Sequence, residues 1–546
     1  MKCTEVVARA LEAEGVEFIT CFPLNQIIDA VAAINIRPIV TRTERVAVNI
    51  VDGYTRMTSG RKIGVCAVQY GPGSENAFAG VAQAYGDSTP LLILAGAGES
   101  ASLSIPPNFK ASRNYRHITK WSETVVDPKS IPQMLQHAFA LLRSGKPGPV
   151  LLEFPSDVML AEFPGSFSYR PQRRYRPSGD EGDVREAVKA LLSAKRPVIV
   201  AGQGVIYSEA WEELRELAEL LQVPVMSSLN GKGAFPENHP LALGVANGFS
   251  RPLTVEHFLA KADLVFGIGT SFTRSKFIAP IPAGKTIAQV TLEETDISKD
   301  YSTSCGVIGD AKAVIARMIA AVKARLGEKG RRGDGAVAAE VRSVKADYLK
   351  QWMPRLTADR EPISPYRVIW ELMQAVDPQK TVVTHDSGCP RDQLVCFYET
   401  VVPHGYVGWG KSTPLGSSLG LIMGAKLARP DWLAVNVMGE AAFGMVGMDF
   451  ETAVRNRIPT MTILMNNGVM GGYTKKQPIA CELFGIHRLS GNYAKVAEAL
   501  GGYGERVERV ADLKPALQRA MDVAKAGNAA FLEVITAEEA DFPGGN

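Results

Sequence analysis

The sequence lacks the features that would place it among membrane, disulfide-rich or nucleic-acid-binding proteins. It has seven cysteines, an odd number with no CxxC pair, which argues against a disulfide framework or a zinc site. The net charge is only +3, and the basic residues form no stripe that would attract a phosphate backbone. No apolar run reaches about 18 residues, the length that spans a bilayer. We therefore expect no nucleic acid and no membrane among its partners, and a cytoplasmic protein with reduced thiols.

What is present is a long chain of ordinary globular composition, with 46% hydrophobic and 21% charged residues among 546. Short β-branched runs alternate with helical patterns, as in KIGVCAVQ, then ENAFAGVAQAYGD, then TPLLILAGA. This alternation is typical of parallel sheets covered by helices. The first residues, MKCTEVVARALEAEGV, have the pattern of an amphipathic helix. The sequence therefore predicts an α/β fold.

Two polar, basic and turn-rich segments interrupt the alternation, at 166–183 and 325–340, and we interpret both as linkers. They divide the chain into three predicted domains, 1–165, 184–325 and 360–546. Each is near the usual domain size and long enough for one doubly wound parallel sheet.

An anion and metal site is predicted in the third of these domains. An apolar run, WLAVNVM, reaches Gly439 and precedes a helix-like MVGMDFETAVRNR, while a second run, TMTILM, leads to paired asparagines ending at Asn467. The backbone N–H groups of Ala441 and Ala442 would face a phosphate at the helix start. The oxygens of Glu440 and Asn467 would lie at the ends of neighbouring strands and would suit Mg²⁺. Taken alone, the Gly-acid-Ala pattern is more typical of an ordinary strand-to-helix turn.

These motifs carry a family resemblance. GEAAF contains Glu440, and the second Asn of NNG, Asn467, follows that acid by 27 residues. This pattern resembles the metal and diphosphate motif of the thiamine diphosphate enzymes, which usually begins with Gly-Asp-Gly and ends with Asn-Asn. The stretch from RTERVAVNIVDGYTR to TPLLILAG resembles the pyrimidine-binding domain of the acetolactate synthase and oxalyl-CoA decarboxylase branch, and GKGAFPENHPLALG resembles its middle domain. The resemblance extends over the whole chain.

The resemblance implies roles for individual residues. Glu44 matches the catalytic acid that faces the aminopyrimidine ring of the cofactor, although its neighbouring arginines are equally typical of a helix-surface charge. Glu440, Asn467 and the backbone carbonyl of Val469 would hold Mg²⁺. Leu415 matches the apolar residue that wedges between the two cofactor rings; its alternative is an ordinary core leucine.

Further positions are implied in the same way. Cys389 and Arg391 stand in a stretch that replaces the usual diphosphate-contacting one, and Arg391 is as typical of a surface cation. Leu24 would lie near the expected substrate cavity. Lys475 and Lys476 follow the second apolar run in a segment that often closes over substrate in the family, although a solvated pair of charges is the more ordinary interpretation. The implied cofactor-binding residues besides Glu44 are Gly388, Cys389, Thr413, Leu415, Gly439, Ala441, Ala442 and Asn467, and the implied substrate-pocket residues are Asn25, Gln69, Tyr70, Phe109 and Tyr473.

Glu440 departs from the family pattern, which has an aspartate there. Three interpretations are open: an active enzyme with a slightly displaced ligand, a site for a larger and more tolerant ion, or a protein that has lost metal affinity. The retained Asn467 and Glu44 favour the first.

The implied activity is a thiamine diphosphate- and Mg²⁺-dependent lyase or transferase reaction that cleaves or forms a C–C bond next to a carbonyl, as in 2-oxo acid decarboxylation with acetolactate synthase-like carboligation. A 2-hydroxyacyl-CoA lyase or oxalyl-CoA decarboxylase-like enzyme is one alternative, and a non-catalytic homologue with an impaired metal site is another. The turns GQGV and GIGTSFTRS leave FAD or ADP possible as a second ligand. The family's site lies between two subunits, so we expect a homodimer or homotetramer in which Glu44 and Glu440 meet only across an interface.

Overall fold

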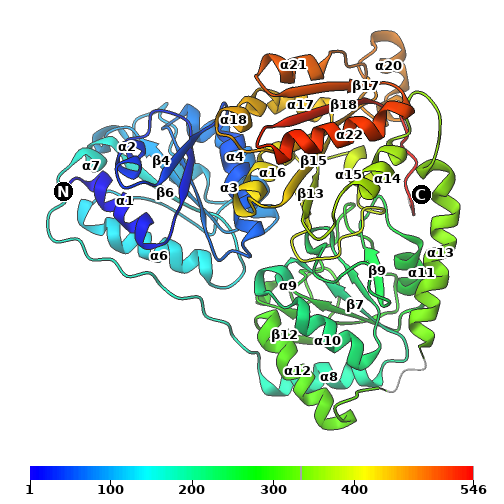
Figure 1. Cartoon of the computed structure of the whole chain (residues 1–546). Helices are drawn as coiled ribbons and strands as arrows, with labels where there is room; N and C mark the ends of the chain where they lie inside the picture. Colours follow the sequence, from blue (N-terminus) through cyan, green and yellow to red (C-terminus); the bar gives the residue numbers. More distant parts are fainter. Residues whose placement is uncertain (332–334, 545–546) are drawn as a thin grey trace.

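The computed structural model describes residues 1–331 and 335–544 and contains three six-stranded sheets that follow one another along the chain (Figure 1). The strand orders are β2-β1-β3-β4-β6-β5, β12-β11-β10-β7-β8-β9 and β14-β13-β15-β16-β18-β17. All neighbouring strands are parallel, and each sheet is built outward in both directions from a central pair, which makes it doubly wound. The predicted α/β fold class is confirmed.

The first sheet lies within residues 18–155, and its four central strands, β1, β3, β4 and β6, are buried almost throughout because helices cover both faces, whereas the edge strands β2 and β5 are partly exposed. The helix expected at the start of the chain is present as α1. The elements are β1 (Phe18–Cys21), β2 (Arg37–Val40), β3 (Gly64–Val68), β4 (Leu91–Ala97), β5 (Trp121–Thr124) and β6 (Val150–Pro155), with α1 (Cys3–Ala13), α2 (Ile27–Ala32), α3 (Glu44–Met57), α4 (Pro72–Gly86), α5 (Ala111–Asn114), α6 (Ile131–Arg143), α7 (Ser156–Leu160) and the short 3-10 turns η1 (Ser100–Ser102) and η2 (Pro128–Ser130).

The second sheet lies within residues 197–308. Its elements are β7 (Pro197–Ala201), β8 (Val225–Ser227), β9 (Ala242–Val245), β10 (Leu264–Ile268), β11 (Thr286–Thr291) and β12 (Cys305–Ile308), with α8 (Glu181–Ser193), α9 (Gln203–Ser208), α10 (Trp211–Leu221), α11 (Leu253–Lys261), α12 (Ala311–Leu326), η3 (Leu229–Gly231) and η4 (Glu294–Asp296).

Between α7 and α8 the chain is extended and crosses from the first sheet's domain to the second (Figure 1). The linker predicted at 325–340 is wrong in part, because α12 continues to Leu326 and α13 (Ala336–Leu356) already begins inside that range; 332–334 lie outside the described residues. Val341 and Val344 of α13 are buried. Contacts with α11 and α14 therefore keep this polar sequence helical.

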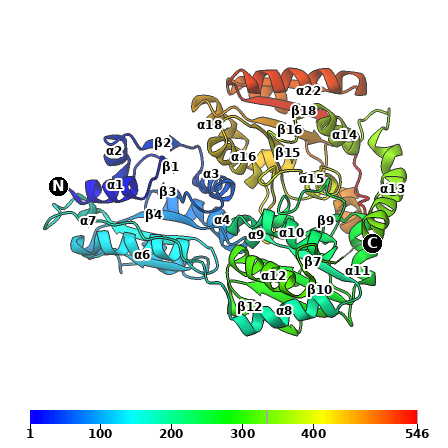
Figure 2. The same cartoon turned by 60° about the horizontal axis from the view of Figure 1, so that its bottom comes forward.

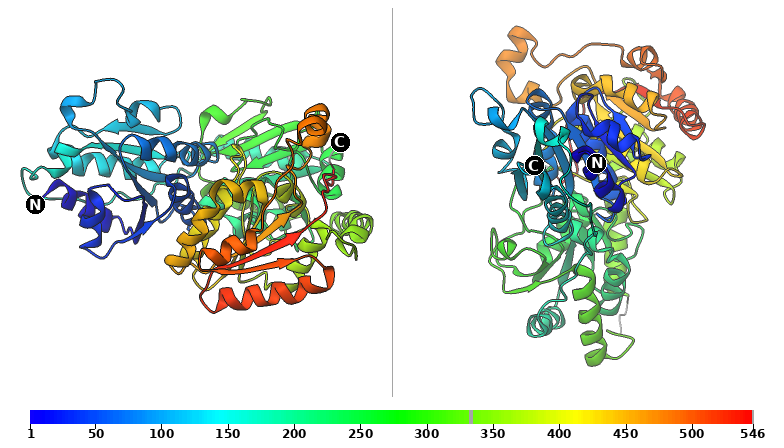
Figure 3. Two further views of the ribbon diagram at one scale, coloured as in Figure 1. Left: turned by 90° about the horizontal axis from the view of Figure 1, so that it is seen from above. Right: turned by 90° about the vertical axis from the view of Figure 1, so that its left-hand side faces the viewer.

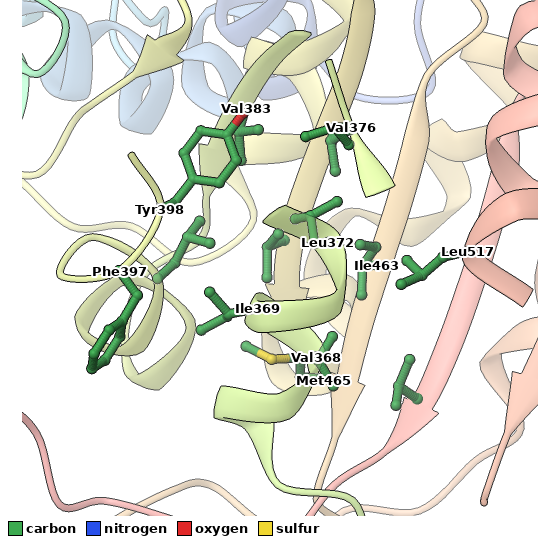
Figure 4. Packing of buried hydrophobic residues seen from close by; sticks show 14 of the residues in the cluster. Val368, Ile369, Leu372, Val376, Val383, Phe397, Tyr398, Ile463, Met465 and Leu517 are labelled. Atoms are coloured by element: carbon green, nitrogen blue, oxygen red, sulfur yellow. The ribbon is translucent and has the colours of Figure 1, made fainter. Parts of the chain in front are cut away.

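The third sheet lies within residues 381–535. Its elements are β13 (Thr381–His385), β14 (Tyr406–Val407), β15 (Leu433–Gly439), β16 (Met461–Asn466), β17 (Tyr503–Val507) and β18 (Ala530–Ile535), with α14 (Pro365–Ala375), α15 (Cys389–Leu394), α16 (Ser417–Ala428), α17 (Glu440–Val446), α18 (Phe450–Arg455), α19 (Tyr473–Lys476), α20 (Pro478–Phe484), α21 (Tyr493–Ala499), α22 (Val510–Lys525) and η5 (Gly447–Asp449). Figure 4 shows part of its core, where Val368, Ile369 and Leu372 of α14 pack beside Ile463 and Met465 of β16.

The first and third domains share one hydrophobic core, centred on the crossing of α3 and α16, which lie side by side (Figures 1 and 2). Two glycines make this crossing possible. A Cβ at Gly53 would lie 2.1 Å from the carbonyl oxygen of Leu421, and one at Gly424 would lie 1.9 Å from that of Ile50. The backbones therefore touch directly. Seen from above, the first domain projects to one side of the other two (Figure 3).

Two observations bear on the expected reduced thiols and on the expected absence of a membrane span. All seven cysteines are free thiols, five of them buried. Within the described residues, no helix is both long enough and apolar enough to cross a bilayer. The cytoplasmic location stays a prediction.

Candidate active site

The predicted strand-to-helix turn around Glu440 is present in the third domain. β15 and β16 are neighbours, with Gly439 opposite Met465, and α17 begins at Glu440 directly after the strand. The helix predicted over 445–457 is wrong in its bounds, because α17 ends at Val446 and α18 starts at Phe450. The break falls at Gly447, where a Cβ would meet the ring of Phe443 at 2.6 Å.

The oxygens predicted to hold a metal converge on one backbone amide. Val469 N–H donates to Glu440 Oε1 at 3.1 Å and to Asn467 Oδ1 at 3.0 Å. Glu440 is only 3% exposed, and burial raises the pKa of its carboxyl. Among the described residues no basic side chain forms an ion pair with it, so the carboxylate has no cation to balance its charge.

This donor set consists of oxygens alone and fits a hard cation such as Mg²⁺. The described part of the chain contains no group of three or more His, Cys, Asp or Glu side chains that could hold a metal. A metal here would therefore depend on the amide of Asn467 and on a backbone carbonyl as well as on Glu440. Val469 lies opposite Arg488 in an isolated antiparallel bridge. The two hydrogen bonds of this bridge are donated by Leu489 N–H to Gly468 O and by Met470 N–H to His487 O. The carbonyl of Val469 takes no part in either bond.

A second pair of residues, which the sequence analysis missed, shapes the turn that carries Asn467. Asn466 Nδ2 donates to Glu533 Oε1 at 2.7 Å, and Asn466 Oδ1 accepts from Gly468 N–H at 3.0 Å. Glu533 is fully buried on β18 and also accepts from Ala494 N–H at 3.0 Å. Asn466 thus fixes the backbone of the turn at Gly468, while Asn467 directs its side-chain oxygen toward Val469 N–H beside Glu440.

The segment after β13 lies beside the Glu440 turn. Gly388 has φ +90° and precedes α15, and a Cβ at Gly471 would lie 2.8 Å from Cys389 Sγ. Burial raises the pKa of Cys389 to about 11, so its thiol is protonated at neutral pH. Cys389 therefore lies beside the segment that follows Asn467, and its contact with a diphosphate stays a prediction.

Arg391 is not the surface cation that one interpretation predicted. It is 2% exposed, binds Asp392 through Nε at 2.8 Å and Nη2 at 2.9 Å, and lies over the rings of Phe249 and Phe277. Its Nη1 has no hydrogen-bond partner among the described residues. The guanidinium therefore helps to join the second and third domains, and its contact with a diphosphate stays a prediction.

Leu415 lies on a turn that a buried carboxylate holds. Asp386, directly after β13, accepts from Gly416 N–H at 3.0 Å and from Ser418 N–H at 3.1 Å, and Gly416 has φ +92°. Leu415 itself is half-buried against the shared core, two residues after half-buried Thr413. An acid that follows an apolar run was the signal that could have identified Asp386 from the sequence.

Glu44 is the first residue of α3, and Thr43 caps that helix by accepting from Val46 N–H. Glu44 is 5% exposed, so the interpretation as a helix-surface charge is wrong. Its Oε2 accepts from Asn76 Nδ2 at 3.2 Å, and its Oε1 lies 3.3 Å from where a Cβ of Gly73 would be. Glycine at that position leaves room for the carboxyl.

The predicted pocket residues of the first domain gather near Glu44 at the carboxyl edge of the sheet, where the strand order reverses between β1 and β3. Asn25 Nδ2 donates to Val68 O at 2.9 Å and to Leu94 O at 3.3 Å, which ties together the ends of β3 and β4. Gln69 and Tyr70 follow β3, and Tyr70 is 53% exposed.

The other predicted residues lie farther along the chain or at another edge. Phe109 is half-buried after β4, and Leu24 is exposed with φ +86°. Tyr473 belongs to α19, which follows Asn467 and Val469 along the chain and also carries the exposed Lys475 and Lys476. Within the described residues of one chain, no hydrogen bond or ion pair joins Glu44 to Glu440 or to Tyr473.

Family models match all three domains. Residues 1–127 match the N-terminal TPP binding domain of the thiamine pyrophosphate enzymes, 184–318 their central domain, and 386–534 their C-terminal TPP binding domain. The chain belongs to the thiamine pyrophosphate enzymes. Both functional turns, at Glu44 and at Glu440, fall inside the two TPP-binding matches.

Similar curated proteins place this thiamine pyrophosphate enzyme in the acetolactate synthase-like branch. It is 28% identical to a probable acetolactate synthase large subunit of Methanococcus aeolicus over 96% of this chain and 90% of that protein. It is 28% identical to the acetolactate synthase isozyme 3 large subunit of Escherichia coli K12, over 97% and 94% of the two chains. A glyoxylate carboligase of Escherichia coli O157:H7 is 29% identical over 95% of this chain and 90% of its own length.

Proposed function

We propose that this chain is a thiamine diphosphate- and Mg²⁺-dependent enzyme that decarboxylates a 2-oxo acid and joins the remaining acyl unit to a second carbonyl, as an acetolactate synthase does. The observation that carries the proposal is the pairing of two built turns: a buried carboxyl at the start of α3 and an oxygen-only donor set at the start of α17. The names of the relatives support carboligation, since they include acetolactate synthases and a glyoxylate carboligase.

In this proposal the third domain binds the charged end of the cofactor. Glu440, Asn467 and the Val469 carbonyl would hold Mg²⁺, which usually bridges phosphate oxygens. The free N–H groups of Ala441 and Ala442 in the first turn of α17 would meet the diphosphate. Among the described residues, a Cβ at Gly439 would have Pro390, at 3.8 Å, as its one neighbour within 4 Å, so the backbone of this turn is not packed against another segment at that point.

Thiamine diphosphate, when bound, would supply an electron sink for the electron pair left on the former carbonyl carbon when the bond to its neighbouring carbon breaks. Glu44 would hold a proton between its carboxyl and the aminopyrimidine ring, and Asn76 orients that carboxyl by donating to Oε2. Leu415 would wedge the cofactor in its bent shape. The buried position of Glu44 excludes water from that proton.

We propose a homodimer or homotetramer as the active form. Glu44 and Glu440 lie at the edges of different sheets, and no hydrogen bond or ion pair joins them among the described residues of one chain. Large apolar side chains are exposed on both domains that would meet, Phe78 and Tyr85 on α4 and Met445 and Met448 near α17. Association of two chains would cover these side chains and bring the two turns to one cofactor.

A nucleotide such as FAD or ADP is the second ligand that we propose, in a cavity of the middle domain. The cavity is lined at the edge where β7 and β10 end by Gln203, Gly204, Gly269 and Thr270. A Cβ at Gly204 would lie 2.6 Å from Gly269, so glycine lets the two turns approach each other. Lys411 enters from the third domain, with Nζ 3.5 Å from Ser271 Oγ, and supplies a positive charge for a phosphate.

The test of the proposed activity is product analysis with labelled pyruvate, thiamine diphosphate and Mg²⁺. We expect labelled carbon dioxide and acetolactate from the native chain, and a loss of at least about 100-fold in rate with Glu44→Gln, which cannot exchange the proton. The same preparation should sediment as a dimer or tetramer. Cofactor binding without turnover of any 2-oxo acid would contradict the proposal and favour the non-catalytic alternative.

A further inference from the structure

A fully buried carboxylate, Asp449, lies next to the turn that carries Glu44, although it comes from the third domain. It is the last residue of η5, and burial raises the pKa of its carboxyl. Among the described residues no basic side chain forms an ion pair with it. Its partners are one backbone amide and two hydroxyls: Oδ1 accepts from Arg42 N–H at 2.7 Å and Thr452 Oγ1 at 2.8 Å, and Oδ2 accepts from Thr43 Oγ1 at 2.9 Å.

Two of these three partners directly precede Glu44. Thr43 is the cap of α3: its Oγ1 donates to Asp449 and accepts from Val46 N–H at 3.4 Å. Both hydrogen-bonding functions of this hydroxyl are therefore used, which fixes the rotamer of Thr43 and the first turn of the helix.

The residue after Glu44 is held by the same domain. Arg45 donates through Nη2 to the carbonyl oxygen of Leu415, on the turn that Asp386 holds. Residues 42, 43 and 45 are thus bound to the third domain, while the Glu44 side chain itself meets Asn76 and Gly73 of the first domain. The backbone before Glu44 is anchored through Arg42 N–H and the Thr43 hydroxyl, Arg45 after it is bound through its side chain, and the carboxyl of Glu44 takes no part in these bonds.

We infer that Asp449 is a positioning residue for Glu44: by holding Arg42 N–H and the Thr43 hydroxyl, it sets where the carboxyl of Glu44 meets the cofactor. The inference rests on the proposed function, because it needs Glu44 to act on thiamine diphosphate. A carboxylate suits this role because it accepts both bonds at once, whereas an apolar residue would leave an amide and a hydroxyl unpaired. Displacing a catalytic group by about 1 Å costs a rate factor of about 100.

The test measures exchange of the thiazolium C2 proton of bound thiamine diphosphate for deuterium, at saturating cofactor and Mg²⁺, by rapid quench and proton NMR. We expect Thr43→Val, which removes the hydroxyl, to slow exchange by about 10- to 100-fold with a cofactor Kd within about threefold of the native value. Thr43→Ser restores the hydroxyl and should recover most of the rate. Asp449→Asn, which cannot accept from Thr43 through its amide nitrogen, should also slow exchange.

Thr452→Val is the matched control, because it removes another hydroxyl from the same carboxylate without touching residues 42–45. Its exchange rate should stay within about threefold of the native rate at a comparable Tm. The inference is overturned if a folded Thr43→Val exchanges like the native protein, or if Thr452→Val slows exchange as much as Thr43→Val. Glu44→Gln separates the two proposals. If this variant exchanges the proton at the native rate, the proposed role of Glu44 is wrong. If Glu44→Gln exchanges slowly while Thr43→Val exchanges at the native rate, only the positioning role is refuted.

Discussion

Replacing Glu440 by aspartate tests whether the longer carboxylate suits the proposed metal site. The Oε1 of Glu440 and the Oδ1 of Asn467 both accept from one backbone amide, that of Val469, at 3.1 and 3.0 Å, so both side chains reach the same turn. Mg²⁺ requires nearly ideal octahedral geometry with metal–oxygen bonds of about 2.1 Å. An aspartate would withdraw its oxygen by about 1.5 Å, one C–C bond, which octahedral Mg²⁺ does not tolerate.

We therefore expect Glu440→Asp to weaken Mg²⁺-dependent binding of thiamine diphosphate by at least about tenfold, or about 1.4 kcal/mol. The fold should lose only about 1 kcal/mol, because the buried site loses one methylene while Val469 N–H keeps its bond to Asn467. Calorimetric titration of the cofactor into chelated protein, with and without Mg²⁺, measures the first quantity, and thermal unfolding measures the second.

The matched control is Glu482→Asp, the same change at an exposed position on α20, which should leave both quantities unaltered. An aspartate variant that binds as tightly as the native chain, or more tightly, would refute the argument that the turn is fitted to a glutamate. If the native chain binds the cofactor with Mn²⁺ or Ca²⁺ but not with Mg²⁺, the interpretation as a site for a larger ion is correct instead.

Two further predictions concern the middle domain and acid stability. ADP should bind the native chain in a calorimetric titration, and Lys411→Met should weaken the affinity for ADP about tenfold. The control Lys189→Met, on the exposed face of α8, should leave that affinity unaltered. Equal affinities of both variants for ADP would contradict the proposed role of Lys411. Burial lowers the pKa of His404 to about 3, so the unfolded chain binds an extra proton between about pH 6.5 and pH 3 and the folded chain does not. Acid therefore destabilises the native chain through this group. The difference in unfolding free energy between the native chain and His404→Gln should shrink by about 2 kcal/mol from pH 6.5 to pH 5, and an unchanged difference would show that His404 titrates normally.

Much of the architecture could be predicted because its signals are local. Apolar runs such as LLILAGA mark strands buried on both faces, and strands that end at Gly439 and Asn466 in parallel neighbours bring Glu440 and Asn467 to one edge. The start of α13 could not be predicted, because its polar sequence is held helical by contacts with α11 and α14 rather than by a pattern of its own.

The supporting side chains of the site could not be predicted, because their partners are far away in the sequence. Asp449 and Arg42 are separated by 407 positions, and Asn466 and Glu533 by 67. No spacing or composition links such pairs. Arg391 was ambiguous for a related reason: its burial depends on Phe249 and Phe277, which a different domain supplies.

Buried carboxylates lie behind three of the turns that carry a proposed functional residue. Asp386 accepts from backbone amides just after Leu415, Asp449 accepts from the Arg42 amide before Glu44, and Glu533 accepts from the side-chain amide of Asn466 before Asn467. Burying a carboxylate has a cost in free energy, which the raised pKa values of Asp386 and Asp449 reflect. An apolar residue would avoid that cost but could not accept from the backbone.

Asp386 and Asp449 hold backbone amides and so fix the path of the chain, whereas a carboxylate that pairs only with a lysine or arginine fixes a flexible side chain. Glu533 does both, because it accepts from Ala494 N–H and also pairs with Arg506 at 3.2 Å. The three turns belong to separate loops, so each needs its own anchor. Because Asp449 and Asp386 both belong to the third domain, the packing of this domain against the first in the same chain also positions Glu44, through residues 42, 43 and 45. Orientation of the proposed catalytic acid is therefore built into the packing of α3 against α16, and changes at this crossing should alter catalysis without touching the cofactor.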